Sequence, residues 1–170
     1  SDKLVAKFGR RKVITSGLCL VATGMLLFAL VNRDTAYGQI AVTFVLLGLG
    51  MGLTMAPSTT AIMEAIPQNK AGVGSATNDA SREIGGALGI AVGGSVLNQI
   101  YQSTLVIPDS LMVYKDVLMN SFPSAMRIGA DNGPDGALLI ASAQEAFVEG
   151  MVGSCYITAA VAILAAIIVW

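Results

Sequence analysis

The sequence contains no histidine and few charged residues, and both shortages exclude classes of protein. Without histidine, the chain cannot by itself form a Ser-His-Asp or Cys-His catalytic arrangement or a histidine-ligated metal site. Charged residues make up 12% of its 170 residues, whereas an ordinary soluble domain contains about 25%. So few charges cannot cover a globule, which argues against a soluble enzyme, a nucleic-acid-binding protein and a disordered tail. We therefore expect no enzymatic activity, no metal site and no nucleic-acid partner.

Cysteine is scarce as well. Cys19 and Cys155 lie far apart inside apolar runs, and no C-x-x-C spacing occurs. We expect both to be small packing residues rather than redox or metal-binding groups.

Long apolar runs are abundant. Hydrophobic residues make up 54% of the chain, and the mean hydropathy is +0.70. A helix of roughly 20 apolar residues crosses a hydrocarbon layer of about 30 Å. The runs therefore predict an all-α membrane protein with four transmembrane helices, at about residues 13–32, 38–63, 71–100 and 148–170.

The beginning of the third span is open to two interpretations. Residues 84–100 are apolar, but residues 71–82 are small and polar. Either the helix starts near Ala71 with polar groups inside the membrane, or a cytoplasmic segment reaches Ile84. We favour the longer helix, because 17 residues are at the lower limit for a span.

A water-compatible loop, residues 102–146, separates the last two spans. Pro108 and the polar pair after it can cap a short amphipathic helix. Residues 129–136 form an expected turn, and Asp135 is expected to start a second helix that leads into the last span. The sequence thus predicts a helical hairpin outside the bilayer, and the apolar stripe of its first helix comprises Leu111, Tyr114, Leu118 and Phe122.

The distribution of charge predicts the orientation. Residues 1–12 contain five basic residues and one acidic residue, whereas residues 102–149 contain two basic and six acidic residues. The four spans predict a multi-pass protein of the cell (inner or plasma) membrane. Loops rich in basic residues stay in the cytoplasm. The amino end is expected in the cytoplasm, and the loop 102–146 outside.

The opening string, residues 1–12, resembles the cytoplasmic loop signature G-x-L-a-D-r-x-G-r-[KR] of the major facilitator superfamily. Glycine at position 9 permits a tight turn, and the acidic and basic residues can pair with each other and with helix ends. A plain cluster of positive charge at the cytoplasmic surface is the alternative interpretation. The matching residues are Asp2, Gly9, Arg10, Arg11 and Lys12.

Small residues and one proline indicate how the spans pack. Gly48 and Gly52 form a G-x-x-x-G face, which lets helix backbones approach closely, and Pro57 is expected to kink the second span. A second such face on the third span comprises Gly85, Gly89 and Gly93.

The order of these strings, with Ala-Phe-Val-Glu-Gly-Met at 146–151, is similar to the carboxyl-terminal part of fourteen-span drug:proton antiporters of the EmrB/QacA type. The resemblance implies that the chain holds the last four spans of a longer transporter. It also implies export of amphipathic or cationic compounds, with the proton gradient as energy source and no cofactor. The implied partners are the lipid bilayer, drug-like small molecules, protons and the missing amino-terminal spans.

Asp79, Arg82 and Glu83 are the candidate proton-coupling and substrate residues. Their spacing places them on one side of a helix. If the helix begins near Ala71, Asp79 lies about 12 Å and Glu83 about 18 Å along it. A carboxylate at such a depth costs on the order of 2.5–3.5 kcal/mol, so it should face a cavity, pair with Arg82 or hold a proton. The alternative is that all three residues are solvated or paired at the cytoplasmic mouth.

Two further interpretations concern the whole chain. The sequence begins Ser-Asp-Lys and ends inside an apolar run, so we expect a piece of a longer protein. The alternative is a stand-alone four-span protein, either a small homodimeric multidrug exporter or a membrane assembly factor. Small exporters place an essential Glu in the first span, where this chain has no acidic residue.

Overall fold

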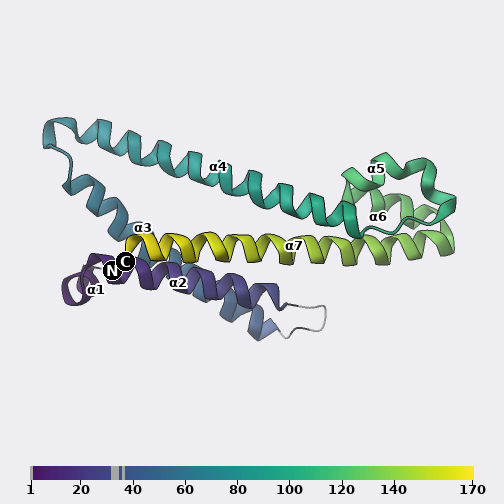
Figure 1. Cartoon of the computed structure of the whole chain (residues 1–170), viewed down its shortest axis with the longest axis horizontal. Coiled ribbons are helices and arrows are strands. Elements are labelled where there is room, and N and C mark those ends of the chain that lie inside the picture. The colour runs from purple at the N-terminus through teal and green to yellow at the C-terminus, as the bar shows by residue number, and fades with distance from the viewer. Residues whose placement is uncertain (1, 32–34, 36) are drawn as a thin grey trace. The chain divides into compact units, whose positions relative to one another are not determined.

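The computed structural model describes residues 2–31, 35 and 37–170, and every regular element within them is helical. This confirms the all-α class. The helices form two compact units, one comprising residues up to Ala91 with Cys155–Trp170, the other comprising Val92–Ser154. The α-helices are α1 (Asp2–Phe8), α2 (Arg10–Ala29), α3 (Tyr37–Glu64), α4 (Ala71–Thr104), α5 (Lys115–Asn120), α6 (Phe122–Asp131) and α7 (Gly133–Val169) (Figure 1), and the 3-10 helices are η1 (Gln68–Lys70) and η2 (Asp109–Tyr114).

Four helices in the described part of the chain are long and apolar enough to cross a membrane: Arg10–Ala29, Tyr37–Glu64, Gln68–Thr104 and Gly133–Val169. The number of spans is the expected one, and α4 begins at Ala71, as the longer of the two interpretations predicted. The expected end of the first span, Asn32, lies outside the described residues. The last helix begins at Gly133, two residues before the expected start at Asp135, and continues through the predicted span to Val169. Pro134 and Asp135 suit the first turn of a helix, and no proline follows them in the sequence.

Within the first unit, α2 and α3 pack closely through glycines. A Cβ atom on Gly50 would lie 2.7 Å from the carbonyl oxygen of Gly17 and 2.9 Å from the backbone nitrogen of Val21. α2 does not pack on the face of Gly48 and Gly52, because a Cβ atom on either would meet nothing within 4 Å among the described residues. Residues two positions away from Gly50 point to other sides of the helix. Packing of Gly48 and Gly52 against helices outside this chain stays a prediction.

Within the second unit, η2, α5, α6 and the first turns of α7 form a folded cap on the end of α4. Its apolar core comprises Tyr101, Leu111, Leu118, Ala125, Leu139, Ala143 and Ala146. The Tyr101 hydroxyl donates a hydrogen bond to the Leu118 carbonyl at 3.1 Å. Phe122 stacks on Phe147 with ring centroids 4.6 Å apart. The expected external loop is therefore an ordered helical cap.

The cap differs from the expected hairpin in its first helix. Leu111 and Leu118 are buried as expected, but Tyr114 is 45% exposed. The reason is that Asp109–Tyr114 is a 3-10 helix, which has three residues per turn and does not follow the α-helical stripe. Ser121 then adopts an extended backbone and separates α5 from α6, where its side chain accepts a hydrogen bond from the Ser124 amide.

The expected turn at residues 129–136 is also shorter than predicted. α6 extends to Asp131 and α7 starts at Gly133, so only Asn132 lies between them. Gly133 has a φ of +55°, which glycine adopts readily. The carbonyl oxygen of Gly129 occupies the place where a side chain on Gly136 would start, and the missing side chains let the two helices cross at this corner.

α4 and α7 also contact each other within the second unit. The Ser154 hydroxyl donates to the carbonyl of Gly93 at 2.7 Å, and the Thr104 hydroxyl donates to the Glu149 carboxylate at 3.0 Å. A Cβ atom on Gly150 would lie 2.7 Å from the carbonyl oxygen of Leu97. Small residues of α7 therefore allow a close approach of the two backbones, as is common between membrane helices.

Candidate functional site

The three charged residues selected from the sequence line one cavity. Asp79, Arg82 and Glu83 of α4, with Met55 of α3, surround an open space of about 610 Å³ within the first unit. All three belong to a helix that is long and apolar enough to span a membrane. The structure therefore brings these residues together at a hollow.

The charges in this cavity do not neutralise one another in pairs. Within the part of the chain that the structure describes, Arg82 forms no ion pair with Asp79 or Glu83. All three side chains are exposed in this chain. With both carboxylates ionised, the cavity carries two negative charges and one positive charge. A membrane helix with such a face is stable only where protein or water, rather than hydrocarbon, covers it.

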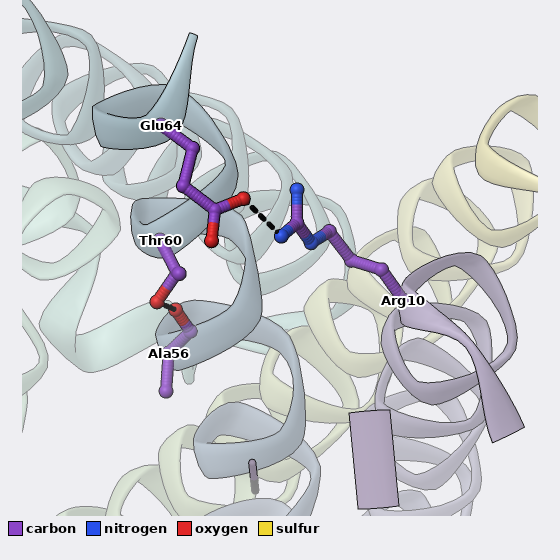
Figure 2. A network of polar contacts seen from close by, with 4 residues as sticks. All are labelled: Arg10, Ala56, Thr60 and Glu64. Carbon is purple, nitrogen blue, oxygen red and sulfur yellow. Dashed lines mark hydrogen bonds and ion pairs between the residues drawn. The ribbon is translucent and has the colours of Figure 1, made fainter. Parts of the chain in front are cut away.

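A second set of polar residues lies where the opening loop meets α3. Gly9, with a φ of +86°, separates α1 from α2 and supplies the turn between them. Arg10 at the start of α2 pairs with Glu64 at the end of α3 (Figure 2). A cavity of about 270 Å³ beside the pair is lined by Val5, Ala6, Arg10, Pro57, Thr60 and Glu64.

Arg10 pairs with an acidic residue outside the opening motif, and the expected pairing of Asp2 with the basic residues stays a prediction. The side chain of Asp2 lies outside the described part, and Arg11 makes no ion pair among the described residues. Sequence analysis missed Glu64, although a signal was present. Two consecutive spans form an antiparallel pair, so the start of one and the end of the next lie on the same side of the membrane. A single carboxylate at the end of the second span is therefore expected on the same side of the membrane as the basic cluster.

Pro57 lies inside α3 and is buried there. Proline lacks the amide hydrogen that would close a turn of the helix. Neighbouring hydroxyls contribute additional hydrogen bonds to carbonyls of the same helix, with Ser58 donating to Thr54 at 2.7 Å and Thr60 donating to Ala56 at 3.1 Å. Figure 2 shows the second of these bonds one turn before Glu64. Neither bond reaches the carbonyl of Leu53, which Pro57 leaves without its helical donor.

The remaining candidate residues lie outside these two sets of polar residues. Cβ atoms on Gly85, Gly89 and Gly93 would meet nothing within 4 Å in the described chain, although the Gly93 carbonyl accepts the bond from Ser154. Lys12 lies beside an apolar hollow between the opening helices and α3. Cys19 is exposed, Cys155 is buried, and both are free thiols.

These four apolar helices define a multi-pass α-helical membrane protein. The family model of the Major Facilitator Superfamily matches residues 2–108, which is most of the chain, and the protein belongs to this superfamily. The resemblance carried by the opening loop and the glycine-rich spans is thereby confirmed.

Several curated proteins are similar to the chain along most of its length. It is 28% identical over 169 residues to the multidrug efflux pump LfrA of Mycolicibacterium smegmatis, covering 98% of this chain and 34% of LfrA. It is 34% identical over 140 residues to the multidrug transporter protein MdtP of Bacillus subtilis, covering 80% of this chain and 25% of MdtP. It is 30% identical over 164 residues to the multidrug resistance protein Stp of Mycobacterium tuberculosis, covering 87% of this chain and 29% of Stp. The chain thus spans between a quarter and about a third of these relatives, and no solved structure matches it.

Proposed function

We propose that this chain is the carboxyl-terminal part of a drug:proton antiporter that exports amphipathic or cationic compounds. The cavity lined by Asp79, Arg82 and Glu83 on an apolar spanning helix is the observation that carries the proposal. Its relatives include proteins named as multidrug efflux pumps and transporters, which supports drug-like compounds as substrates.

The charge of this cavity gives a reason why a proton and a cationic compound would displace each other. Two carboxylates and one guanidinium give a net charge of −1. One proton or one monovalent cation brings the charge to zero, and both together would leave an uncompensated positive charge. Uncompensated charge becomes costly once the other spans of the full-length protein shield this cavity from water. Proton and cation therefore compete for the carboxylates, and this competition is the basis of exchange.

Alternating access turns this competition into transport. With the cavity open to the cytoplasm, an ionised carboxylate binds the cationic group of the compound, while the soft thioether of Met55 contacts its apolar part. With the cavity open to the outside, a proton takes the place of the cation and the compound leaves. We assign the coupling role to Glu83, because it lies about 18 Å from the start of α4, against about 12 Å for Asp79.

The remaining assignments follow from the same proposal. The protein lies in the cell membrane with its amino end in the cytoplasm and the cap outside, as its charge distribution predicts. The amino-terminal spans of the longer protein cover the charged face of α4. Membership in the superfamily favours this assignment over a stand-alone four-span exporter or assembly factor.

Everted membrane vesicles that contain the full-length protein test the proposed function. With an acidified lumen, we expect a cationic dye to accumulate inside and the lumen to lose protons at the same time. A protonophore should abolish both. Accumulation that persists without a proton gradient, or that moves no protons, would contradict antiport.

A further inference from the structure

An apolar hollow lies where α1 meets α2 and α3 in the first unit. It has a volume of about 330 Å³, and it is lined by Leu4, Phe8, Lys12, Val13, Ser16 and Leu53. The Ser16 hydroxyl donates to the Val13 carbonyl at 2.8 Å, so it needs no partner inside the hollow. We call this space the α1 hollow, and its walls are apolar except at Lys12.

The α1 hollow lies at the level of the lipid headgroups. α2 begins at Arg10 and has 20 residues, so it is about 30 Å long, which matches the thickness of the hydrocarbon layer. Its first turn, with Lys12, and the preceding helix α1 therefore lie at the membrane surface. Leu4 and Phe8, one turn apart on α1, remain exposed there. Apolar side chains of a surface helix reach the boundary between headgroups and acyl chains.

The segment around the α1 hollow carries more positive charge than this chain neutralises. Residues 1–12 contain five basic residues and a single acidic residue, Asp2. Among the side chains that the structure describes in this segment, Arg10 is the one that forms an ion pair, and its partner is Glu64. If Asp2 neutralised a second basic residue, three positive charges would still remain. Their counterions come from outside this chain.

Two of these unpaired cations lie beside the α1 hollow. Lys12 is part of its lining. The Lys7 ammonium lies over the ring of Phe8, 5.3 Å from the ring centroid, and this ring forms part of the wall. A lysine can lay its apolar stem along such a wall while its ammonium stays among the headgroups. Positive charge and an apolar space therefore adjoin each other.

This combination favours one kind of occupant. A transmembrane helix of the longer protein would fill the apolar walls but would leave the ammonium groups without a counterion, which is costly where water is displaced. A phospholipid of no net charge brings its own cation beside its phosphate. An anionic phospholipid carries an acyl chain and a net negative charge on one molecule. Basic clusters next to the ends of membrane helices attract lipids of this kind.

We infer that the α1 hollow binds an acyl chain of an anionic phospholipid, and that Lys12 and Lys7 contact its phosphate group. The walls select for the chain, and the two ammonium groups select for the negative charge. The site is independent of the cavity on α4, so it does not rest on proton antiport.

Photolabelling of the full-length protein tests this inference. The probe is a phosphatidylglycerol with a photoreactive diazirine in its acyl chain, and a phosphatidylcholine with the same chain is compared with it. Each is added in small amount to phosphatidylcholine vesicles that contain the protein, and peptide mass spectrometry locates the labelled residues. The variants are Lys12→Gln and the charge-preserving Lys12→Arg. Lys3→Gln is the matched control, because Lys3 is exposed on α1 but does not line the hollow.

We expect the phosphatidylglycerol probe to label residues 4–16 and the segment around Leu53 several-fold more than the phosphatidylcholine probe does. Unlabelled phosphatidylglycerol should compete with it, and inorganic phosphate should not. Lys12→Gln should lose most of this preference, whereas Lys12→Arg and Lys3→Gln should keep it.

Four results would overturn the inference. Absence of label at these residues would show that a protein segment fills the hollow, and equal labelling by both probes would show ordinary lipid contact. Competition by inorganic phosphate would show an anion site that needs no acyl chain. An unchanged preference in Lys12→Gln would show that this lysine does not select the headgroup. Dye efflux enters none of these readouts, so a failure of antiport in the vesicle assay is a separate result.

Discussion

The guanidinium of Arg10 is paired with the carboxylate of Glu64, 54 residues later in the chain. The pair joins the start of α2 to the end of α3, one turn beyond the Thr60 bond to Ala56. Both side chains are partly exposed, at 37% and 59%, so their attraction adds only about 0–1 kcal/mol to the stability of the fold. The pair is therefore better suited to bias one conformation of the protein than to hold the fold together.

Replacing Arg10 tests that role. We expect Arg10→Ala to lower dye efflux several-fold and to change the balance of inward and outward accessibility, while thermal stability changes little. The exchange of charges in Arg10→Glu with Glu64→Arg should restore part of the efflux. Equal efflux and accessibility in wild type and Arg10→Ala would show that the pair is only a surface contact.

Gly50 and Gly48 make a matched pair of variants on α3. A side chain on Gly50 would meet backbone atoms of Gly17 and Val21, and neither can move without shifting α2. We expect Gly50→Ala to destabilise the packed pair by about 1–3 kcal/mol and to lower folded yield in detergent. Gly48→Ala, with nothing within 4 Å in the described chain, should leave this pair intact. Equal yields of the two variants would contradict the packing of α2 against α3.

The aromatic stack in the cap offers a test of whether the cap is ordered. Phe147 is half-buried, so Phe147→Ala should cost about half of the 3–5 kcal/mol typical of a fully buried Phe. We expect faster hydrogen exchange of the backbone amides of α5 and α6 in this variant. Leu138→Ala, at a position that is 64% exposed in the same stretch of α7, is the control. Exchange that is already fast in the wild type would show that the cap is not a folded unit.

A substitution at Gly89 tests a face of α4 that no described residue covers. No described residue lies within 4 Å of a Cβ atom placed there. If the rest of the full-length protein packs on this glycine, Gly89→Leu should lower the folded yield in membranes, because close packing is the main attraction between membrane helices. Normal yield and activity of this variant would mean that the glycine faces lipid or a cavity.

Much of this fold could be predicted from the sequence, because the bilayer imposes simple rules. Apolar length and charge set the number of spans, and the polar start of α4 at Ala71 was predictable once a 17-residue span was judged too short. The register of the α2–α3 contact was not predictable. Gly48, Gly50 and Gly52 are equivalent candidates in the sequence, and only the position of α2 decides which of them it contacts.

The candidate site was predictable in part for similar reasons. Charged residues inside a span are rare enough to identify Asp79 and Glu83 directly. The partner of Arg10 depends on a contact between distant segments, and Glu64 was overlooked because it lies outside the opening motif. The burial of Tyr114 in the cap was predicted wrongly, because the sequence does not indicate a 3-10 helix where an α-helical stripe is expected.

Drug efflux by Glu83→Gln and Asp79→Asn in the full-length protein, measured against an imposed pH gradient, tests the central proposal most directly. Each change replaces a carboxylate by a neutral amide at nearly constant volume, so the cavity should lose its competition between proton and cation. We expect Glu83→Gln to abolish efflux driven by the gradient, and Asp79→Asn to weaken it. Unaltered efflux with unaltered pH dependence in both variants would contradict the assignment of these carboxylates as the proton-coupling site.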